Sequence, residues 1–275
     1  MSNVPSPSEP WSLKGKTAVI TGGSRGIGSG IAVHFARKGL SNLAITYVAN
    51  EAAANKTLEK CRKLGVKNAI TIQADVTDTA VGPKIIKEAV SRLSVTTIDI
   101  LVNNAILGDV SRTVDLKTLE AKNFNEIMVG NVYSPVSLTV AFMEFAPKYG
   151  GRVINISSTA SKTGNPEFIM TYGATKAALD SYTRSFADTF ASSTGITFNS
   201  VSVGPTETDA LAAAKDMLPG FVEEQIKSIS AAPRFGTTDD VAYIVGFLAS
   251  EEGRWVNGAA VSANGGHRLT LALFG

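Results

Sequence analysis

The sequence predicts a doubly wound α/β fold, in which a parallel sheet of seven strands carries helices on both faces. Short apolar runs of strand length alternate with segments whose apolar residues recur at helical spacing, and this alternation is typical of a parallel sheet covered on both sides. The chain has 275 residues, of which 44% are hydrophobic. A chain of this length and composition buries one large core, so we expect a single domain.

Seven apolar runs are expected to form the strands. In chain order they are Thr17–Thr21, Asn42–Thr46, Ala69–Gln73, Ile98–Val102, Arg152–Ile156, Thr197–Val203 and Ala259–Ser262. In a doubly wound sheet, ligands bind beyond the carboxyl ends of the strands, where the winding direction reverses. We therefore expect the chemistry of the protein in the segments that follow the strands.

The two ends of the chain differ in composition from the domain between them. Residues 1–12 are rich in proline and serine, and we predict a disordered lead-in that lacks the basic start and apolar core of a signal peptide. The domain spans residues 13–266. Residues 267–275 form an apolar tail, for which we hypothesise packing at a subunit interface, the alternative being packing against the sheet of its own subunit.

Composition excludes several classes of protein. The net charge is +2 and the basic residues are scattered, so no nucleic acid partner is expected. A single cysteine, Cys61, excludes an intramolecular disulfide, and with only two histidines no metal site is expected. No uninterrupted apolar stretch reaches membrane-spanning length. These features predict a cytoplasmic protein without a membrane partner.

The most specific motif is a glycine-rich turn, Thr21 to Gly28, between the first strand and a helical segment. A strand, a glycine turn and a helix N-terminus together present backbone N–H groups to the pyrophosphate of a dinucleotide, as in Rossmann-type folds. The spacing is GxxxGxG rather than the commoner GxGxxG. An ordinary glycine-rich turn is the alternative. The residues expected to contact the cofactor here are Gly22, Ser24, Arg25, Gly26, Ile27 and Gly28.

The segment after the second strand indicates which dinucleotide is bound. Tyr47 stands where a protein that binds NAD would carry an acidic residue for the ribose hydroxyls. Arg25 can bind an additional 2′-phosphate through its guanidinium fork, so NADP (NADPH) is predicted. Glu51 nearby leaves NAD open, and the alternative for Arg25 is a solvated turn residue. Further cofactor contacts are expected, after the second, third and fourth strands, from Tyr47, Asn50, Asp75, Val76, Asn103 and Ala105.

Candidate catalytic residues follow the fifth strand. That strand ends at Ser158, and one loop later Tyr172 precedes Lys176 by four positions, which places both on one helix face. An ammonium group beside a phenol lowers its pKa from about 10, so that Tyr172 can exchange a proton near neutral pH. Ser158 would donate a hydrogen bond to a reacting carbonyl oxygen, and Lys176 would hold the nicotinamide ribose. An exposed helix pair without a role is the alternative.

From about Leu13 to Gly266 the chain resembles the short-chain dehydrogenase/reductase family. The TGxxxGxG of that family corresponds to Thr21–Gly28, its NNA to Asn103–Ala105 and its YxxxK to Tyr172–Lys176. The resemblance implies a further catalytic residue, Asn131, which would hold a water molecule between Lys176 and solvent. It assigns the catalytic serine to Ser158, with Ser157 as a minor rival. It also implies cofactor contacts from Gly204, Pro205, Thr206 and Thr208.

Three positions depart from the family pattern. Ile106 replaces a glycine after NNA, Val203 replaces a proline, and Asn264 replaces an aspartate. None of them belongs to the expected proton path, so the departures concern the shape of the substrate site. The YxxMxxxK spacing of enoyl-reducing members is absent, because Met170 precedes Tyr172. Reduction of a carbon–carbon double bond is therefore not favoured.

The resemblance also implies a mobile substrate lid over residues 206–233. An apolar pocket suited to an uncharged ring or chain is expected there. The alternative is that these apolar residues only pack the lid onto the core. The residues expected to contact the substrate are Ser158, Phe168, Met170, Tyr172, Met217 and Phe221.

The combined motifs predict an NADPH-dependent carbonyl reductase in which Tyr172 donates the proton. The chain is similar to polyhydroxynaphthalene and 3-ketoacyl reductases, so an apolar ketone or a polyketide or ring-type substrate of secondary metabolism is expected. Two alternatives remain open at this stage: alcohol oxidation by the same groups, and a non-catalytic dinucleotide-binding protein. Because members of the family are commonly tetrameric, the resemblance implies a homo-oligomer, expected to be a tetramer.

Overall fold

The computed structural model describes residues 9–107, 116–209, 211 and 220–267. The strands are β1 (Thr17–Ile20), β2 (Asn42–Tyr47), β3 (Asn68–Gln73), β4 (Ile100–Asn103), β5 (Gly151–Ser158), β6 (Ile196–Val203) and β7 (Ala260–Ala263). They form one seven-stranded sheet in the order β3-β2-β1-β4-β5-β6-β7, and every neighbouring pair is parallel. The predicted doubly wound sheet is confirmed, and the winding reverses between β1 and β4.

The predicted strand limits differ from the observed ones by at most two residues. In β4, Ile100 is the first residue that pairs with β1. Ile98 lies outside the sheet, and its N–H donates to the carbonyl of Phe145. At the other end of the neighbouring strand, Ser157 and Ser158 still pair with β6. The strand β5 therefore carries the sheet further toward its carboxyl edge than its apolar run predicts.

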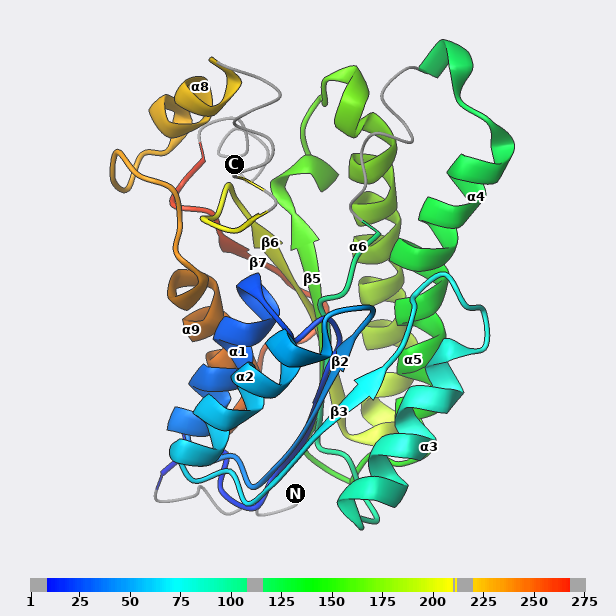
Figure 1. Ribbon diagram of the computed structural model, residues 1–275, viewed down its shortest axis with the longest axis vertical. Coiled ribbons are helices and arrows are strands. Elements are labelled where there is room, and N and C mark those ends of the chain that lie inside the picture. Colours follow the sequence, from blue (N-terminus) through cyan, green and yellow to red (C-terminus); the bar gives the residue numbers. More distant parts are fainter. Residues whose placement is uncertain (1–8, 108–115, 210, 212–219, 268–275) are drawn as a thin grey trace.

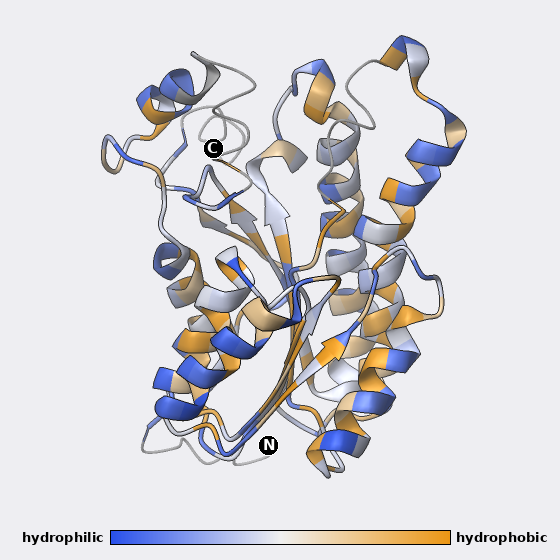
Figure 2. Ribbon diagram, in the orientation of Figure 1, coloured by the Kyte–Doolittle hydropathy of each residue, from blue (hydrophilic) through white to orange (hydrophobic). Residues whose placement is uncertain are grey.

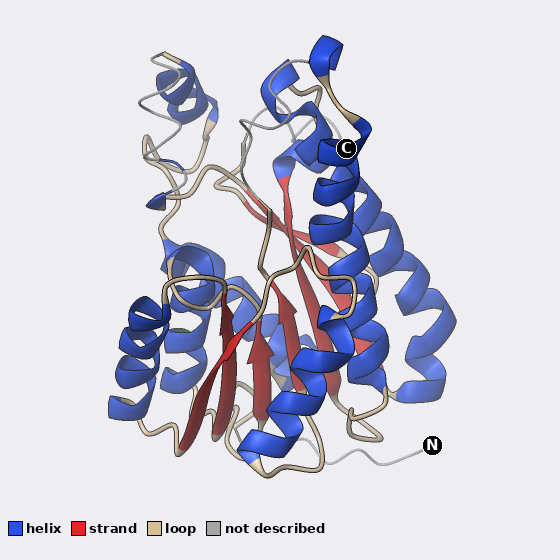
Figure 3. Ribbon diagram, turned by 45° about the vertical axis from the view of Figure 1, so that its right-hand side comes forward, coloured by secondary structure: helices blue, strands red, loops and turns tan. Residues whose placement is uncertain are grey.

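Two layers of helices cover the sheet (Figures 1 and 3). One face carries α1 (Gly26–Arg37), α2 (Glu51–Lys63) and α9 (Thr238–Ala249), and the other carries α3 (Val81–Leu93), α4 (Ala121–Met128), α5 (Ser134–Met143) and α6 (Glu167–Thr194). The helix α8 (Phe221–Ser228) lies beyond the carboxyl ends of the strands (Figure 1). None of the helices in the described ranges is both long and apolar enough to cross a membrane.

Each face of the sheet has its own apolar core. Adjacent strand residues point to opposite faces, so Ile20 packs with α1 and α9, whereas Val19 packs with α3 and α5. Because both faces are buried, β1 and β4 are nearly continuous apolar runs, and Figure 2 shows orange segments along the sheet between the two layers of helices. The polar residues of the site are thereby confined to the ends of the strands.

The amino edge of the sheet, opposite the site, is fixed by a buried ion pair. Arg152 of β5 is fully buried and donates to Glu251 at 2.8 Å and to the carbonyl of Gly151 at 3.1 Å. Burial lowers the pKa of Arg152, and Glu251 opposes that shift. The carbonyl of Pro10 accepts from the N–H of Glu251, so residues 9–12 of the expected lead-in contact the domain at this edge.

Candidate active site

The glycine turn is too closely packed for other residues. Gly22 and Gly26 have φ values of 64° and 55°, which disfavour residues with a Cβ. A Cβ on Gly28 would lie 2.3 Å from the carbonyl oxygen of Gly22 and 2.6 Å from the side-chain nitrogen of Asn104. The helix α1 begins after Arg25, with no side-chain cap and no acidic residue in its first turn. These N–H groups and the close approach of the chain fit a bound pyrophosphate.

The Asn-Asn-Ala segment fixes this turn to β4. The hydroxyl of Thr21 accepts from the N–H groups of Asn104 and Ala105, both at 2.9 Å, and the Asn104 side chain donates to the Thr21 carbonyl at 2.8 Å. The Asn103 side chain donates to Asn155 of β5 at 2.8 Å. These asparagines therefore tie the ends of neighbouring strands together. The side-chain nitrogen of Asn103 already donates to Asn155. A cofactor contact from Asn103 is therefore expected from its backbone.

The other expected cofactor residues come to the same edge, and several already have partners. Tyr47 is buried at the end of β2, and Val76 is buried after β3. Asn50 caps α2 through its side-chain oxygen. Asp75 accepts from both the N–H and the hydroxyl of Thr77 at 2.9 Å. The structure therefore brings these segments together, while the capping and turn roles of Asn50 and Asp75 limit their side chains.

Arg25 forms an ion pair that the sequence did not predict. Its Nη1 lies 3.2 Å from Oδ2 of Asp209, and both side chains are 75% exposed. An ion pair this exposed contributes about 0–1 kcal/mol, so an incoming anion can displace it. The two residues are 184 positions apart, and only the fold brings Asp209 beside the glycine turn.

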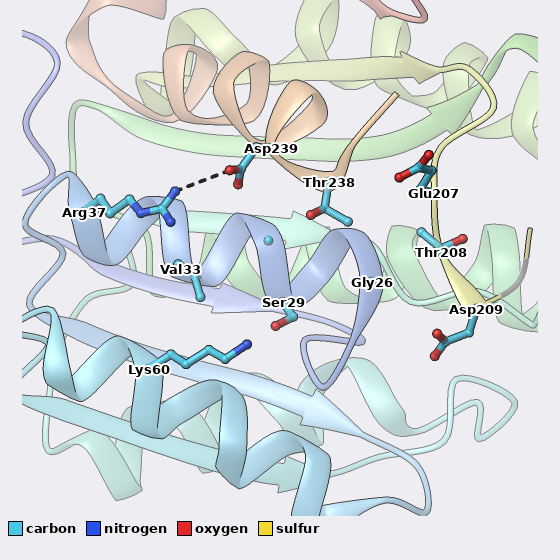
Figure 4. A pocket seen from close by; sticks show the side chains of 11 residues that line it. Gly26, Ser29, Val33, Arg37, Lys60, Glu207, Thr208, Asp209, Thr238 and Asp239 are labelled. Atoms are coloured by element: carbon cyan, nitrogen blue, oxygen red, sulfur yellow. Dashed lines mark ion pairs between the residues drawn. The ribbon is translucent and has the colours of Figure 1, made fainter. Parts of the chain in front are cut away.

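A polar pocket of about 440 Å³ adjoins the glycine turn on the outer side of α1 (Figure 4). Figure 4 shows Lys60 extending toward α1 from α2, and the Arg37–Asp239 ion pair at the far end. Neither Ser158 nor Tyr172 lines this pocket. It is therefore separate from the place where the candidate catalytic residues lie.

Ser158 and Tyr172 meet at the carboxyl end of β5. The chain turns through η4 (Thr159–Ser161), and α6 begins at Glu167, five residues before Tyr172. Burial raises the pKa of Tyr172, and its hydrogen bond with Ser158 lowers it, with burial the larger cause. The expectation that the Lys176 ammonium brings this pKa down is therefore wrong for the protein without cofactor. Tyr172 is a neutral phenol at neutral pH.

Lys176 is nearly inaccessible, with 2% of its surface exposed. Its Nζ donates to the carbonyl of Ile156 at 2.7 Å and lies 5.7 Å from the centre of the Tyr172 ring. Burial lowers the pKa of Lys176 to about 8, and the charge of Asp180 acts in the opposite direction. Asp180 is one helical turn further along α6, 4% exposed, and neither carboxylate oxygen accepts a hydrogen bond. Asp180 belongs to none of the predicted motifs, and its spacing of four residues from Lys176 is the one signal in the sequence that points to it.

Asn131 lies in a π-helical turn, η3 (Val129–Tyr133), between α4 and α5. It is 1% exposed, and its side-chain oxygen accepts from the N–H of Leu107 at 2.8 Å. Its nitrogen donates to Thr175, the neighbour of Lys176, at 3.5 Å. The π-turn, a feature frequent at functional sites, places Asn131 between the segment after β4 and α6. The chain thus brings Asn131 beside the Tyr172–Lys176 helix.

The segment expected over the nicotinamide is anchored at the same edge. The N–H of Gly204 donates to the carbonyl of Ala263, and Thr206 is bridged to Gly236. A Cβ on Gly26 would lie 3.5 Å from the methyl carbon of Thr208. Thr208 therefore lies close to the glycine turn, and the cofactor contacts that the resemblance implies for residues 204–208 stay a prediction.

The expected substrate contacts are only partly covered by the structure. Phe168 is half-buried and Met170 is exposed, both in the first turns of α6. Ile106, after the Asn-Asn-Ala segment, is also exposed. Met217 lies outside the described residues, and so does the side chain of Phe221. Across the described ranges, no cluster of three or more His, Cys, Asp or Glu residues is placed to hold a metal ion.

The fold and this arrangement of residues define a Rossmann-type oxidoreductase. A family model described as Enoyl-(Acyl carrier protein) reductase matches residues 22–268. Over 263 residues the chain is 57% identical to Short chain dehydrogenase penD of Penicillium thymicola, covering 95% of both chains. It is 52% identical over 263 residues to Short chain dehydrogenase asqE of Emericella nidulans, covering 95% of this chain and 97% of the relative. The chain belongs to the short-chain dehydrogenase/reductase family.

Solved structures agree with this assignment. A short chain dehydrogenase from Burkholderia cenocepacia J2315 in complex with NADP superposes with a TM-score of 0.83 and 32% identity, covering 93% of this chain and 99% of that one. The promiscuous reductase LugOII, which catalyses keto-reduction at C1 during lugdunomycin biosynthesis, superposes with a TM-score of 0.82 and 36% identity, covering 93% and 98%.

The depressed pKa of Lys176 predicts a pH-dependent stability. The pKa of Lys176 is about 8 in the folded protein and 10.5 for an ordinary lysine. Between these values the unfolded chain binds more protons, so the free energy of unfolding rises with pH. Relative to Lys176→Met, the wild type is expected to gain about 3 kcal/mol between pH 7 and 11. Urea unfolding of both proteins at several pH values measures this gain.

Asp180→Asn supplies the control for the pKa of Lys176. Without the carboxylate the pKa of Lys176 falls further, so the gain in unfolding free energy begins at lower pH. A difference between wild type and Lys176→Met that stays constant with pH would contradict the assignment.

Proposed function

We propose that the protein is an NADPH-dependent carbonyl (keto) reductase. A hydride goes to the carbonyl carbon and a proton from Tyr172 goes to the carbonyl oxygen, which yields an alcohol. The observation that supports this most strongly is the Ser158–Tyr172 hydrogen bond at the carboxyl end of β5, with Lys176 one helical turn further on α6. These groups lie at the same edge of the sheet as the glycine turn.

In the protein without cofactor, Tyr172 holds the proton that reduction of a carbonyl requires. A carbonyl reductase needs a protonated phenol at the start of the reaction, whereas alcohol oxidation needs the phenolate as a base. Burial raises the pKa of Tyr172, so the phenol is ready to donate. Ser158 would donate a hydrogen bond to the carbonyl oxygen and stabilise the charge that develops there.

Lys176 and Asn131 would return the proton to Tyr172. With its pKa of about 8, the buried Lys176 can both hold and release a proton near neutral pH. Asn131 reaches Thr175 on the same helix and the backbone of Leu107, and would hold a water molecule that links Lys176 to solvent. The presence and proximity of all four side chains favour an enzyme over a non-catalytic dinucleotide-binding protein.

The residues around the glycine turn fit NADPH, which would supply the hydride. The N–H groups at the start of α1 would hold the pyrophosphate, and the Arg25 guanidinium would bind the 2′-phosphate in place of Asp209. Tyr47 adds no negative charge at the end of β2 to repel that phosphate. Ser24 and Ile27 belong to the same turn, and Lys176 would hold the nicotinamide ribose. The Burkholderia neighbour in complex with NADP supports the same choice.

The substrate is proposed to be an apolar ketone of the polyketide or ring type. Ile106 and Met170 are large apolar side chains exposed on segments that lead into the site, and Phe168 precedes Met170 by two residues on α6. Such a rim favours an uncharged ring or chain over a sugar phosphate. The keto-reduction described for LugOII supports this class and a role in secondary metabolism. Although the matching family model carries the name of an enoyl reductase, the absent YxxMxxxK spacing supports carbonyl reduction.

A homo-oligomer is also proposed, with the apolar outer surface of α5 and α6 as its interface. Val140 of α5, and Tyr182 and Phe190 of α6, are large apolar residues that are exposed in the single chain. The expected tail interface, at residues 267–275, lies outside the described residues except for His267, which is buried within its own subunit. The expected tetramer remains a proposal.

Tyr172→Phe is expected to lower kcat/KM for ketones at least ~100-fold, because the proton donor is removed while the aromatic ring remains. NADPH absorbance, followed with a panel of apolar ketones and quinones, measures the rate, and NADPH fluorescence checks that the cofactor still binds. If the variant and the wild type consumed NADPH equally with every substrate, the proton-donor role of Tyr172 would be wrong.

Arg25→Ala is expected to weaken NADPH binding ~10-fold or more, because a charge-assisted contact to the 2′-phosphate is lost, and to leave NADH binding nearly unchanged. Asp209→Asn is expected to act in the opposite direction, since it removes the group that competes for the guanidinium. Arg37→Ala, which removes an exposed arginine at the other end of α1, is the matched control. Equal effects of Arg25→Ala on the two nucleotides would exclude NADP selection by Arg25.

Val140→Glu is expected to reduce the mass of the protein in solution, measured by light scattering, because a charge in an apolar interface is left unpaired. Deleting residues 269–275 tests the tail in the same way. An unchanged mass after the deletion excludes the tail interface, and an unchanged mass for Val140→Glu excludes the α5–α6 surface.

A further inference from the structure

The chain that follows β7 is hydrogen-bonded to the end of the helix α8, far from it in sequence. The N–H groups of Ser230 and Ala231 donate to the carbonyl of Gly265 at 3.2 and 2.9 Å. The hydroxyl of Ser230 donates to the carbonyl of Gly266 at 2.8 Å. Ile229 and His267 form an antiparallel bridge. These bonds form a backbone clamp between residues 229–231 and residues 265–267.

The clamp continues into a buried side-chain contact. His267 is 3% exposed, and its Nε2 lies 2.9 Å from the side-chain oxygen of Gln225, one turn before the end of α8. Burial lowers the pKa of His267, so the imidazole is neutral at neutral pH. With the proton on Nε2, it donates to the Gln225 carbonyl oxygen, an acceptor that can make no ion pair.

Two glycines make this approach of the chains possible. Gly265 and Gly266 have φ values of 62° and 66°, which residues with a Cβ rarely adopt. A Cβ on Gly265 would lie 2.8 Å from Cγ2 of Ile229, and one on Gly266 would lie 2.3 Å from the hydroxyl of Ser230. The Gly-Gly pair after β7 therefore lets this segment pack closely against Ile229 and Ser230.

The place of α8 in the chain explains why such a clamp matters. The two ends of the expected lid form a stem, in which the N–H of Glu207 donates to the carbonyl of Gly236 at 2.8 Å. That stem closes the base of the lid but does not reach α8. The helix has eight residues, and no side chain caps its N-terminus at Gly220. A helix this short is marginal by itself, so its position depends on tertiary contacts.

We propose that His267 is a positioning residue that holds α8, through Gln225, beyond the carboxyl ends of the strands, the edge of the sheet at which the candidate catalytic residues lie. Figure 1 shows α8 beyond the carboxyl ends of the strands, near the chain that follows β7. His267 acts on the helix and not on the reacting atoms. The segment after β7 thereby influences which ketones the site accepts. The expected effect on KM rests on the proposed reductase function, whereas the positioning of α8 does not.

The experiment compares wild type, His267→Ala, Gln225→Ala and the double variant. Hydrogen exchange of the α8 amides is the structural measurement, and KM and kcat for an apolar ketone are the catalytic ones. Either single variant is expected to speed exchange in α8 and to raise KM ~10-fold with a smaller change in kcat, since one hydrogen bond is lost and its partner stays buried. Because both single variants break the same bond, the double variant is expected to add little.

Controls separate positioning from general damage. Lys227→Ala removes an exposed side chain from the same helix and is expected to change neither exchange nor KM. His267→Gln keeps a hydrogen-bond donor. Its α8 exchange rate and its KM are therefore expected to lie between those of His267→Ala and those of the wild type. The affinity for NADPH, which binds at the glycine turn, is expected to stay the same in all variants.

The outcomes distinguish this inference from the proposed function. If α8 exchanges at the wild-type rate in His267→Ala and Gln225→Ala, the clamp role is overturned. Faster exchange with an unchanged KM overturns the effect on substrate selection. If the wild type reduces no ketone while the two variants still speed exchange in α8, the proposed function fails and the positioning of α8 stands.

Discussion

The candidate active site depends on the hydrogen bonds between Thr21, which follows β1, and the Asn104–Ala105 segment, which follows β4. They join β1 to β4, the two neighbouring strands between which the winding of the sheet reverses. Gly28 packs against the same contact, without room for a Cβ. The start of α1 is thereby fixed beside the segments that follow β4 and β5, and a dinucleotide bound at one end would meet Tyr172 at the other.

Burial supplies the chemistry at that edge. It holds Tyr172 as a neutral phenol and brings the pKa of Lys176 to about 8, while Asp180 keeps that pKa from falling further. Removing charged groups from water is costly, so burial brings the pKa of Lys176 toward the range in which it releases its proton. The ordinary apolar core beneath, with its two layers, provides the rigidity for this arrangement.

Much of the fold could be predicted because its signals are local. Apolar runs placed the strands within two residues, and the glycine spacing located the start of α1. Errors arose where hydrogen bonds, and not hydropathy, decide the limit of an element: β5 continues through Ser157 and Ser158 because β6 pairs with them. The spacing of apolar residues does not predict the π-helical turn at Asn131.

The sequence by itself determined the fold class and the identity of the candidate groups, because glycine spacing, strand periodicity and the Tyr172–Lys176 interval are short-range patterns. Only the tertiary structure decided the state and the partners of those groups. It turned the expected lowering of the Tyr172 pKa into a rise, paired Arg25 with Asp209 and joined His267 to Gln225. Burial and contacts between distant segments exist only once the chain has folded, and they set protonation and position.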